Sequence, residues 1–301
     1  TAIIFENEKL TYSELNEKIN QVAHRLRSLG VGPNDFVAII SERSIEMIVG
    51  IFGILKAGGA YVPIDSSNPA ERILYMLENC NPKAILLYNT AMTFATEKEI
   101  PVLDLADESL NSENIENPDR VNVSEDTVYC IYTSGTTGRP KGVPNAHRGL
   151  LNIVTWLQKK YPLTEDDTIL QKTTFVFDVS ASEIFWWCAA GASLAILQPD
   201  GEKDPAIIMD TVYTNRVSVL DYAPSALNVF LGSIGNKKEN LYKLRSVKYL
   251  ISAGEALNRD TVAKAYRIAE EGGLRWQLKN LYGPTEASIY STWYDCTSDC
   301  D

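Results

Sequence analysis

Apolar residues recur along the chain with two spacings, one typical of amphipathic helices and the other of buried strands. Between residues 11 and 30 they return at helical spacing, after a capping box formed by Thr11 and Glu14 and before the terminator Gly30. Further helices are predicted at residues 44–56, 147–161, 205–214 and 260–271. Short, mostly apolar runs predict strands at residues 36–40, 83–88, 127–134, 168–171, 192–197, 217–222 and 247–252.

The alternation of these strands and helices predicts an α/β fold with mostly parallel sheet flanked by helices. Such sheets bind ligands at the carboxyl ends of their strands, so we expect the chemistry just after the strands. A length of 301 residues suggests two lobes, which we place at residues 36–165 and at residues 1–35 plus 166–301. The polar segment 106–125, rich in Asn, Asp, Glu and Ser, is predicted to be a surface loop or lobe connection.

Composition narrows the class of protein further. The chain is 45% apolar and 22% charged, which is typical of a globular protein, and its net charge of −11 argues against a basic nucleic-acid surface. The five cysteines show no repeated spacing, which indicates free thiols in a reducing compartment. The first residues do not read as a signal peptide, and no apolar stretch is long enough to span a bilayer. We therefore expect a cytoplasmic protein with neither a membrane nor a nucleic acid as its partner.

Residues 132–142, with the sequence YTSGTTGRPKG, follow a predicted strand and combine hydroxyls, glycines and a lysine. Glycines let backbone N–H groups approach an anion, hydroxyls add donors and Lys141 supplies a cation, so the segment suits a polyphosphate. It is not a Walker A loop, because no Gly-Lys-Ser/Thr stands at the required spacing. Composition alone leaves a polar surface turn as an equal alternative.

Two other motifs carry candidate chemistry. In NLYGPTE, residues 280–286, an aromatic ring can stack on a base, an Asn amide can pair with a base edge, and Thr and Glu can serve a phosphate and its Mg²⁺. In FDVS, residues 177–180, a carboxylate among apolar residues needs a cation, unless Asp178 or Ser180 caps a helix.

Together these motifs resemble the adenylation domains of nonribosomal peptide synthetases, in the adenylate-forming superfamily of acyl-CoA synthetases and luciferases. They occur in the family's order, as LTYSEL at residues 10–15, LKAGGAYVPID at 55–65, YTSGTTGRPKG at 132–142, FDVS at 177–180 and NLYGPTE at 280–286. The resemblance covers essentially the whole chain and implies the large N-terminal core of an adenylate-forming enzyme.

The resemblance implies an ATP-dependent ligase that activates an amino acid for secondary metabolite biosynthesis. The carboxylate of the amino acid attacks the α-phosphorus of ATP, which gives aminoacyl-AMP and releases pyrophosphate. The aminoacyl group then passes to the phosphopantetheine thiol of a peptidyl carrier protein. The implied cofactors are ATP and Mg²⁺, and the implied partners are the free amino acid, the carrier domain and neighbouring synthetase domains.

The same resemblance assigns the nucleotide-binding residues. Asn280 would meet the adenine amino group, Tyr282 would stack on the ring and Gly254 would lie beside it. Thr285 would bind the α-phosphate and Glu286 the Mg²⁺. The phosphate loop would consist of Thr133, Ser134, Gly135, Thr136, Thr137, Gly138 and Lys141. Thr133, Lys141, Thr285 and Glu286 are the expected catalytic residues.

The family's substrate pocket falls on Asp178, Val179, Ser182, Asp221, Ile251, Ala253, Leu281, Ile289 and Tyr290. Asp178 would pair with the α-ammonium of the amino acid. None of these positions holds a Lys or Arg that could partner Asp221. We therefore favour a long basic substrate, with Arg ahead of Lys or ornithine, over Gln or an aromatic amino acid.

One difference from the family's sequence and two alternative functions stay open. The family continues beyond this motif with a ribose-binding Asp, a hinge and a mobile domain that carries a catalytic Lys, none of which is in these residues. We therefore expect the 301 residues alone to be an incomplete core that adenylates poorly. An acyl- or aryl-CoA synthetase is the first alternative function, although its substrates lack the ammonium that Asp178 would meet. A nucleotide-binding fragment without catalysis is the second.

Overall fold

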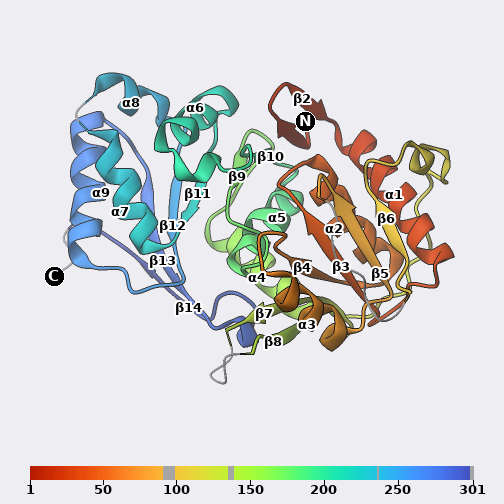
Figure 1. The fold of residues 1–301 in the computed structure, drawn as a ribbon. Helices are drawn as coiled ribbons and strands as arrows, with labels where there is room; N and C mark the ends of the chain where they lie inside the picture. Colours follow the sequence, from red (N-terminus) through yellow and green to blue (C-terminus); the bar gives the residue numbers. More distant parts are fainter. Residues whose placement is uncertain (91–98, 135–138, 236, 299–301) are drawn as a thin grey trace. The chain divides into compact units, whose positions relative to one another are not determined.

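The computed structural model describes residues 1–90, 99–134, 139–235 and 237–298. The chain divides into two compact units, residues 1–9 plus 153–301 and residues 10–152 (Figure 1). Each unit is built on one sheet, and the predicted α/β class with mostly parallel strands is confirmed. No helix in the described ranges is long and apolar enough to cross a membrane.

The unit formed by residues 10–152 contains a six-stranded sheet in the order β6-β5-β3-β4-β7-β8. Its strands are parallel except for the antiparallel pair β7 and β8. The strands are β3 (Phe36–Ser41), β4 (Ala60–Ile64), β5 (Ala84–Tyr88), β6 (Val102–Asp104), β7 (Thr127–Thr133) and β8 (Lys141–Ala146). The helices are α1 (Tyr12–Ser28), α2 (Ile45–Ala57), α3 (Ala70–Cys80) and the 3₁₀ helix η1 (Glu108–Ser112), and α4 (His147–Lys160) begins here.

The ends of α1 and α2 lie where the sequence predicted them. The Thr11 hydroxyl accepts from the backbone N–H of Glu14 at 3.2 Å, and the Glu14 carboxylate accepts from the Thr11 N–H at 2.8 Å, so the capping box is complete. Ser44 caps α2, and Gly58 ends it with a left-handed φ of 113°. Gly53 lets α1 approach closely, because a Cβ there would lie 2.5 Å from Val22.

The polar segment 106–125 runs over the surface of this unit and is tied to α1 and α2 by side-chain hydrogen bonds. Asn20 donates to the carbonyl of Ile115 at 2.6 Å, and Gln21 to that of Asn111 at 3.0 Å. Lys56 Nζ donates to the Oδ1 atoms of Asn20 and Asn117, each at 2.7 Å. These bonds satisfy polar groups of helices that would otherwise be buried without partners.

The packing of α1 against the polar segment 106–125 is one reason why α1 belongs to the unit of residues 10–152. The sequence placed residues 1–35 with residues 166–301, but α1 packs against α2 and this segment in the unit of residues 10–152. Only residues 1–9 of that stretch belong to the other unit, because β1 (Ile3–Phe5) pairs in parallel with β10 (Ser193–Ile196).

The unit formed by residues 1–9 and 153–301 contains an eight-stranded sheet in the order β14-β13-β12-β11-β9-β10-β1-β2. The remaining strands are β2 (Glu8–Leu10), β9 (Thr168–Gln171), β11 (Val219–Tyr222), β12 (Tyr249–Ser252), β13 (Gln277–Tyr282) and β14 (Thr292–Asp295). The helices are α5 (Val179–Ala190), α6 (Pro205–Asn215), α7 (Pro224–Ile234), α8 (Lys238–Lys243), α9 (Arg259–Gly272) and the 3₁₀ helices η2 (Gly201–Lys203) and η3 (Thr285–Ala287).

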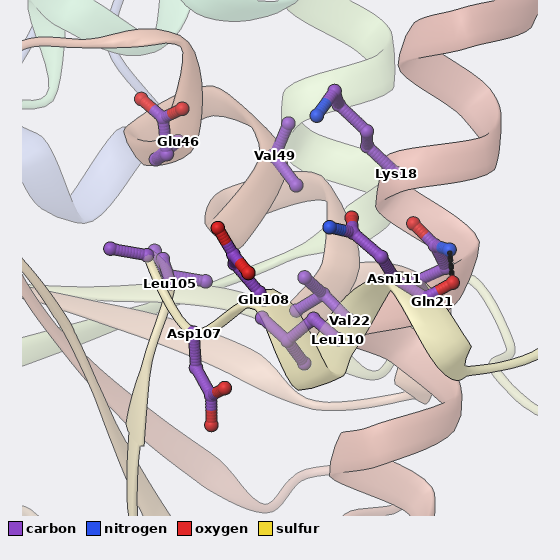
Figure 2. Close-up of a pocket in the computed structure, with 11 residues that line it drawn as sticks. Lys18, Gln21, Val22, Glu46, Val49, Leu105, Asp107, Glu108, Leu110 and Asn111 are labelled. Atoms are coloured by element: carbon purple, nitrogen blue, oxygen red, sulfur yellow. Dashed lines mark hydrogen bonds between the residues drawn. The ribbon is translucent and has the colours of Figure 1, made fainter.

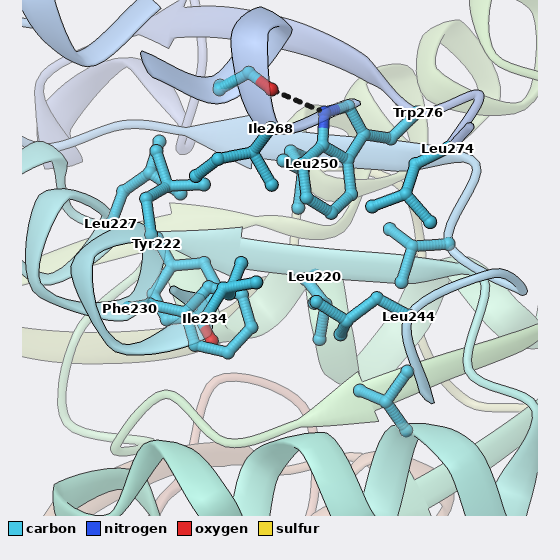
Figure 3. Close-up of a cluster of buried hydrophobic side chains, with 14 of the residues drawn as sticks. Leu220, Tyr222, Leu227, Phe230, Ile234, Leu244, Leu250, Ile268, Leu274 and Trp276 are labelled. Carbon is cyan, nitrogen blue, oxygen red and sulfur yellow. Dashed lines mark hydrogen bonds between the residues drawn. The ribbon is translucent and has the colours of Figure 1, made fainter. Parts of the chain in front are cut away.

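One face of this sheet carries the main hydrophobic core of the unit (Figure 3). Leu220 and Tyr222 of β11 and Leu250 of β12 pack there against α7 and α9, where Phe230 and Ile268 lie. Successive strand residues point to opposite faces, so Asp221 and Ile251 lie on the other face. Asp221 thus lies on the face opposite to the one on which Leu220 and Leu250 pack.

Candidate functional site

Three predicted pocket residues that are distant in sequence meet in one buried cluster. The Tyr290 hydroxyl donates to Oδ2 of Asp221 at 2.9 Å. The Ser182 hydroxyl lies 3.4 Å from the same oxygen and 3.3 Å from the Tyr290 hydroxyl. Ile251 is the residue directly beside Asp221 on β12. All four are buried, so the structure brings together the predicted pocket positions of α5, β11, β12 and the segment after η3.

The Asp221 carboxyl is held in a dry environment. Its Oδ1 atom is buried and has no hydrogen-bond partner among the described residues. Burial, followed by the nearby charge of Glu183, raises the pKa of Asp221 to about 7. The Lys172 ammonium and the hydrogen bonds from Tyr290 and Ser182 act in the opposite direction. Asp221 is therefore a carboxyl group that can hold a proton near neutral pH.

Asp178 occupies the N-cap position of α5, but its side chain makes no capping hydrogen bond. A helix therefore begins directly after Asp178, one of the two capping positions that the sequence suggested, but the Asp178 side chain does not cap it. Burial raises the pKa of Asp178, and hydrogen bonds from Thr285 and the Val179 N–H oppose that rise. Its Oδ2 atom is buried without a partner among the described residues. This oxygen can accept a hydrogen bond from a cationic group.

The segment that follows β13 is a tight loop that displays an aromatic ring. Tyr282 is 66% exposed, and its carbonyl accepts from the Ser291 N–H at 2.8 Å, which closes the loop. Gly283 lies against the returning chain, because a Cβ there would overlap the Ile289 carbonyl oxygen and lie 2.7 Å from Tyr290 Cα. Ile289 itself has a φ of 72°, which is rare for a β-branched residue and stores strain. The loop therefore holds Tyr282 outside and Ile289 inside.

Other predicted residues of this unit lie nearby on the same sheet. Asn280 on β13 is the register partner of Ser252 on β12. Gly254, two residues beyond Ser252, has a φ of 90°, and nothing lies within 4 Å of the place where its Cβ would be. Pocket positions Ala253 and Leu281 are buried, whereas Val179 and Thr285 are half-buried and Glu286 is exposed. The open space at Gly254 leaves room for a flat group.

The phosphate-loop motif lies on a β-hairpin of the other unit. Thr133 ends β7 and pairs directly with Lys141, the first residue of β8. Strand β8 was not predicted, since the sequence indicated only the strand before the loop. The Tyr75 hydroxyl on α3 donates to the Pro140 carbonyl at 3.3 Å, and the Tyr132 hydroxyl donates to Asn79 Oδ1 at 2.7 Å. The hairpin base is thus fixed to α3.

Comparison with known protein families identifies the chain. The family described as AMP-binding enzyme matches residues 1–301. The chain belongs to the AMP-binding enzyme family. The predicted resemblance is therefore confirmed at the level of the family, over the whole length of the chain.

Several proteins named as synthases are similar to the chain. A mycosubtilin synthase polypeptide from Bacillus subtilis is 44% identical over 304 residues, which cover 99% of this chain and 11% of that protein. Zwittermicin A synthase ZmaJ from Bacillus cereus is 44% identical over 298 residues, which cover 98% of this chain and 56% of that protein. The chain thus spans only part of the length of these relatives.

Solved structures of other proteins share the fold. The nonribosomal peptide synthetase FmoA3 in its alpha-methyl-L-serine-AMP bound form matches with a TM-score of 0.90 and 26% identity, over 98% of this chain and 32% of that one. The Klebsiella oxytoca NpsA N-terminal subdomain, in complex with 3-hydroxybenzoyl-AMSN, matches with a TM-score of 0.84 and 25% identity, over 98% of this chain and 71% of that one.

Two charged residues of this AMP-binding chain were missed by the sequence argument. Lys172 directly follows β9 and is 7% exposed, and Glu183 lies within α5 and is 2% exposed. Both act electrostatically on the pKa of Asp221, Glu183 raising it and Lys172 lowering it. A signal was present, because Glu183 is the single charged residue of helix α5 and Lys172 directly follows the buried strand β9.

A pocket of about 180 Å³ in the unit of residues 10–152 contains none of the predicted site residues (Figure 2). It lies between α1, α2 and η1, and Lys18, Glu46 and Glu108 are among its lining residues.

Four predicted phosphate-loop residues, Gly135, Thr136, Thr137 and Gly138, lie outside the described residues. Ser134 is described and is exposed.

Proposed function

We propose that the protein activates an amino acid with ATP, forming aminoacyl-AMP and releasing pyrophosphate. The observation that carries this proposal is the Asp178 carboxyl, whose buried Oδ2 atom has no partner among the described residues. An α-ammonium group supplies both the charge and the donor that such an oxygen needs. Membership of the AMP-binding enzyme family and the similarity to FmoA3, which holds an aminoacyl-AMP in one form, support the same reaction.

The nucleotide would be held by residues with distinct tasks. The exposed Tyr282 ring offers a face on which adenine can stack, and the empty space beside Gly254 accommodates a flat base. Asn280 would pair with the edge of the base. In the hairpin, Thr133 and Lys141 lie opposite each other and would contact the phosphates, together with Ser134 and the loop residues. This binding would offset the repulsion between the two reacting anions.

Magnesium fits this arrangement as an ion shared with the nucleotide. The described residues contain no group of three or more His, Cys, Asp or Glu side chains that could hold a metal by itself. An exposed single carboxylate, Glu286, suits an ion whose other ligands are phosphate oxygens and water. When bound, Mg²⁺ would neutralise phosphate charge, while Thr285 would donate to the α-phosphate.

Transfer to a carrier protein is the second half of the proposal. Two of the similar proteins are named as synthases and are longer than this chain, which spans 11% and 56% of their lengths. We infer that a phosphopantetheine thiol on a peptidyl carrier domain accepts the aminoacyl group, and that neighbouring synthetase domains accompany it. Cytoplasmic synthesis of a secondary metabolite is the corresponding setting.

Amino-acid-dependent exchange of pyrophosphate into ATP tests this function in the enzyme as its gene encodes it. We expect exchange with at least one amino acid and a strong loss in Asp178→Asn, whose neutral amide cannot pair with the ammonium. Asp166→Asn, an exposed position just before β9, is the matched control. Exchange with aryl or fatty acids alone would favour the alternative ligase, for which the NpsA complex with 3-hydroxybenzoyl-AMSN is the precedent. Nucleotide binding without exchange would indicate a non-catalytic module.

A further inference from the structure

The Tyr290 side chain reaches from the segment after η3 to helix α5 and strand β11. Its hydroxyl donates to Oδ2 of Asp221 on β11 at 2.9 Å and lies 3.3 Å from the Ser182 hydroxyl on α5. The Ser182 hydroxyl lies 3.4 Å from the same Asp221 oxygen and 2.8 Å from the Val179 carbonyl. These polar groups are in mutual contact, so protein atoms fill the space between α5 and β11 at the level of Ser182.

The apolar pocket positions around Tyr290 are closed as well. They are all buried, and they are Ile251, Ala253, Leu281 and Ile289. Ile251 lies directly beside Asp221 in the sheet, and Ile289 directly precedes Tyr290 in the chain. Buried side chains of this kind pack at nearly the density of an organic crystal, so little free volume remains between them.

The backbone that carries Tyr290 is held in place by the tight loop. The Tyr290 N–H donates to the Ser288 carbonyl at 2.9 Å, and the Ser291 N–H donates to the Tyr282 carbonyl at 2.8 Å. Tyr290 Cα also lies so close to Gly283 that a Cβ on that glycine would be 2.7 Å away. The ring therefore cannot leave its place by a simple shift of its own backbone.

The predicted pocket is accessible at its other end, where α5 begins. Asp178 and Val179 are half-buried, whereas Ser182 is 2% exposed. Asp178 and Ser182 are four residues apart, so they lie on the same face of the helix, about 6 Å apart along its axis. An amino acid whose ammonium meets Asp178 therefore has about one helical turn before its side chain reaches Ser182 and Tyr290.

We propose that Tyr290 closes the substrate pocket about one helical turn from Asp178, and that the enzyme therefore activates an amino acid with a short side chain, such as Ala or Ser. The inference rests on the proposed amino-acid activation and names its substrate class. Non-bonded atoms stay about 3.5 Å apart, so roughly 3 Å of the 6 Å remains for the side chain. That length corresponds to about two covalent bonds of 1.5 Å.

Longer side chains would have to displace the Tyr290 ring. The side chains of Gln, Lys and Arg exceed two bonds in length. A basic side chain would reach Asp221 only by separating Oδ2 from the hydroxyls of Tyr290 and Ser182, because Oδ1 is buried. This substrate class differs from the long basic one that the sequence favoured, because only the folded chain shows Tyr290 in the space beside Ser182.

The test compares kcat/KM for Ala, Ser, Gln, Lys, Arg and Tyr in pyrophosphate exchange by the enzyme as its gene encodes it. We expect Ala or Ser to exceed each of the longer amino acids by about tenfold or more. This comparison needs no variant, so it stays decisive if a substituted enzyme does not fold.

Variants at Tyr290 test whether the ring sets the limit. Tyr290→Ala removes the ring, so the ratio of long to short substrates should rise by about tenfold or more. Tyr290→Phe keeps the ring and loses the hydroxyl, so it should shift the ratio much less. Tyr242→Ala, which removes an exposed ring from α8, is the control and should leave the ratio unchanged. Each ratio compares substrates within one variant, so a loss of folded enzyme cancels.

The outcomes separate this inference from the function on which it rests. A native enzyme that prefers Gln, Lys, Arg or Tyr would overturn the short pocket and leave amino-acid activation intact. An unchanged ratio in folded Tyr290→Ala would overturn it too, as would a shift in Tyr290→Phe as large as that in Tyr290→Ala. Failure of every amino acid to support exchange, in an enzyme that still binds ATP, would instead refute the proposed function itself.

Discussion

Tyr290 and Asp221 are 69 residues apart in the chain, yet the tyrosine hydroxyl donates a 2.9 Å hydrogen bond to the aspartate carboxyl inside the protein. Both residues are at least nine-tenths buried, with exposed fractions of 4% and 2%. A buried carboxyl that shares its surroundings with Glu183 and Lys172 makes the stability of the protein depend on pH in a defined direction.

Asp221→Asn should remove part of that pH dependence. The pKa of Asp221 rises from 3.8 to about 7 on folding, so the native state binds more protons and its stability falls as pH rises between these values. Relative to the native protein, Asp221→Asn should gain about 2–3 kcal/mol in the free energy of unfolding between pH 5 and pH 8. Urea denaturation at the two pH values measures this difference. Asp166→Asn, which is exposed, should show none, and a difference of the opposite sign would contradict an Asp221 that is neutral in the native state.

Gly283→Ala should disrupt the loop that presents Tyr282. Its new Cβ would overlap the Ile289 carbonyl oxygen and lie 2.7 Å from Tyr290 Cα. Both of these are backbone atoms, which cannot move away as the end of a side chain can. We expect a loss of about 2–4 kcal/mol in the free energy of unfolding. In Gly232→Ala on α7, the Cβ would meet only the flexible end of Lys264, at 3.2 Å. That control should be neutral or slightly stabilising, by up to about 1 kcal/mol, because alanine favours helix. Equal melting temperatures for the two variants would show that the loop relaxes freely.

Tyr282→Ala should weaken nucleotide binding without affecting the fold. The ring is 66% exposed and therefore contributes little to the core. Loss of stacking on the adenine should cost about 1–3 kcal/mol of binding free energy, measured by calorimetry with ATP and Mg²⁺. Tyr242→Ala on α8 removes a ring of similar exposure, 51%, and should leave binding unchanged. Native-like affinity in Tyr282→Ala would exclude the stacking role.

Lys141→Ala should slow adenylation and leave stability nearly unchanged. Its side chain is exposed at the start of β8, so its removal should alter the free energy of unfolding by less than about 0.5 kcal/mol. Loss of a phosphate-binding cation should lower the exchange rate by about tenfold or more. Thermal unfolding and pyrophosphate exchange measured on the same sample separate the two effects. A large fall in melting temperature with normal exchange would assign the lysine a structural role instead.

Local signals in the sequence were sufficient for many of the elements and for several of their ends, although not for β4, β8, α3 or α7. Thr11 and Ser44 cap helices whose first turns they immediately precede, and Gly58 ends a helix in the conformation that glycine tolerates best. Strands such as β3 and β5 are nearly continuous apolar runs, as is typical of parallel strands covered by helices. These features depend on neighbours in the chain, which is why they could be read without a structure. The ordered motifs likewise indicated the family.

Tertiary structure decided the electrostatics of the pocket. Ser182 and Tyr290 reach Asp221 across 39 and 69 residues, and Lys172 and Glu183 share its surroundings although neither belongs to the predicted pocket. The sequence shows that a carboxyl group is present, but its charge depends on how much water remains and on which distant groups fold around it. Burial and long-range contact are properties of the packed chain, so only the folded protein showed that Asp221 is buried against Ser182 and Tyr290.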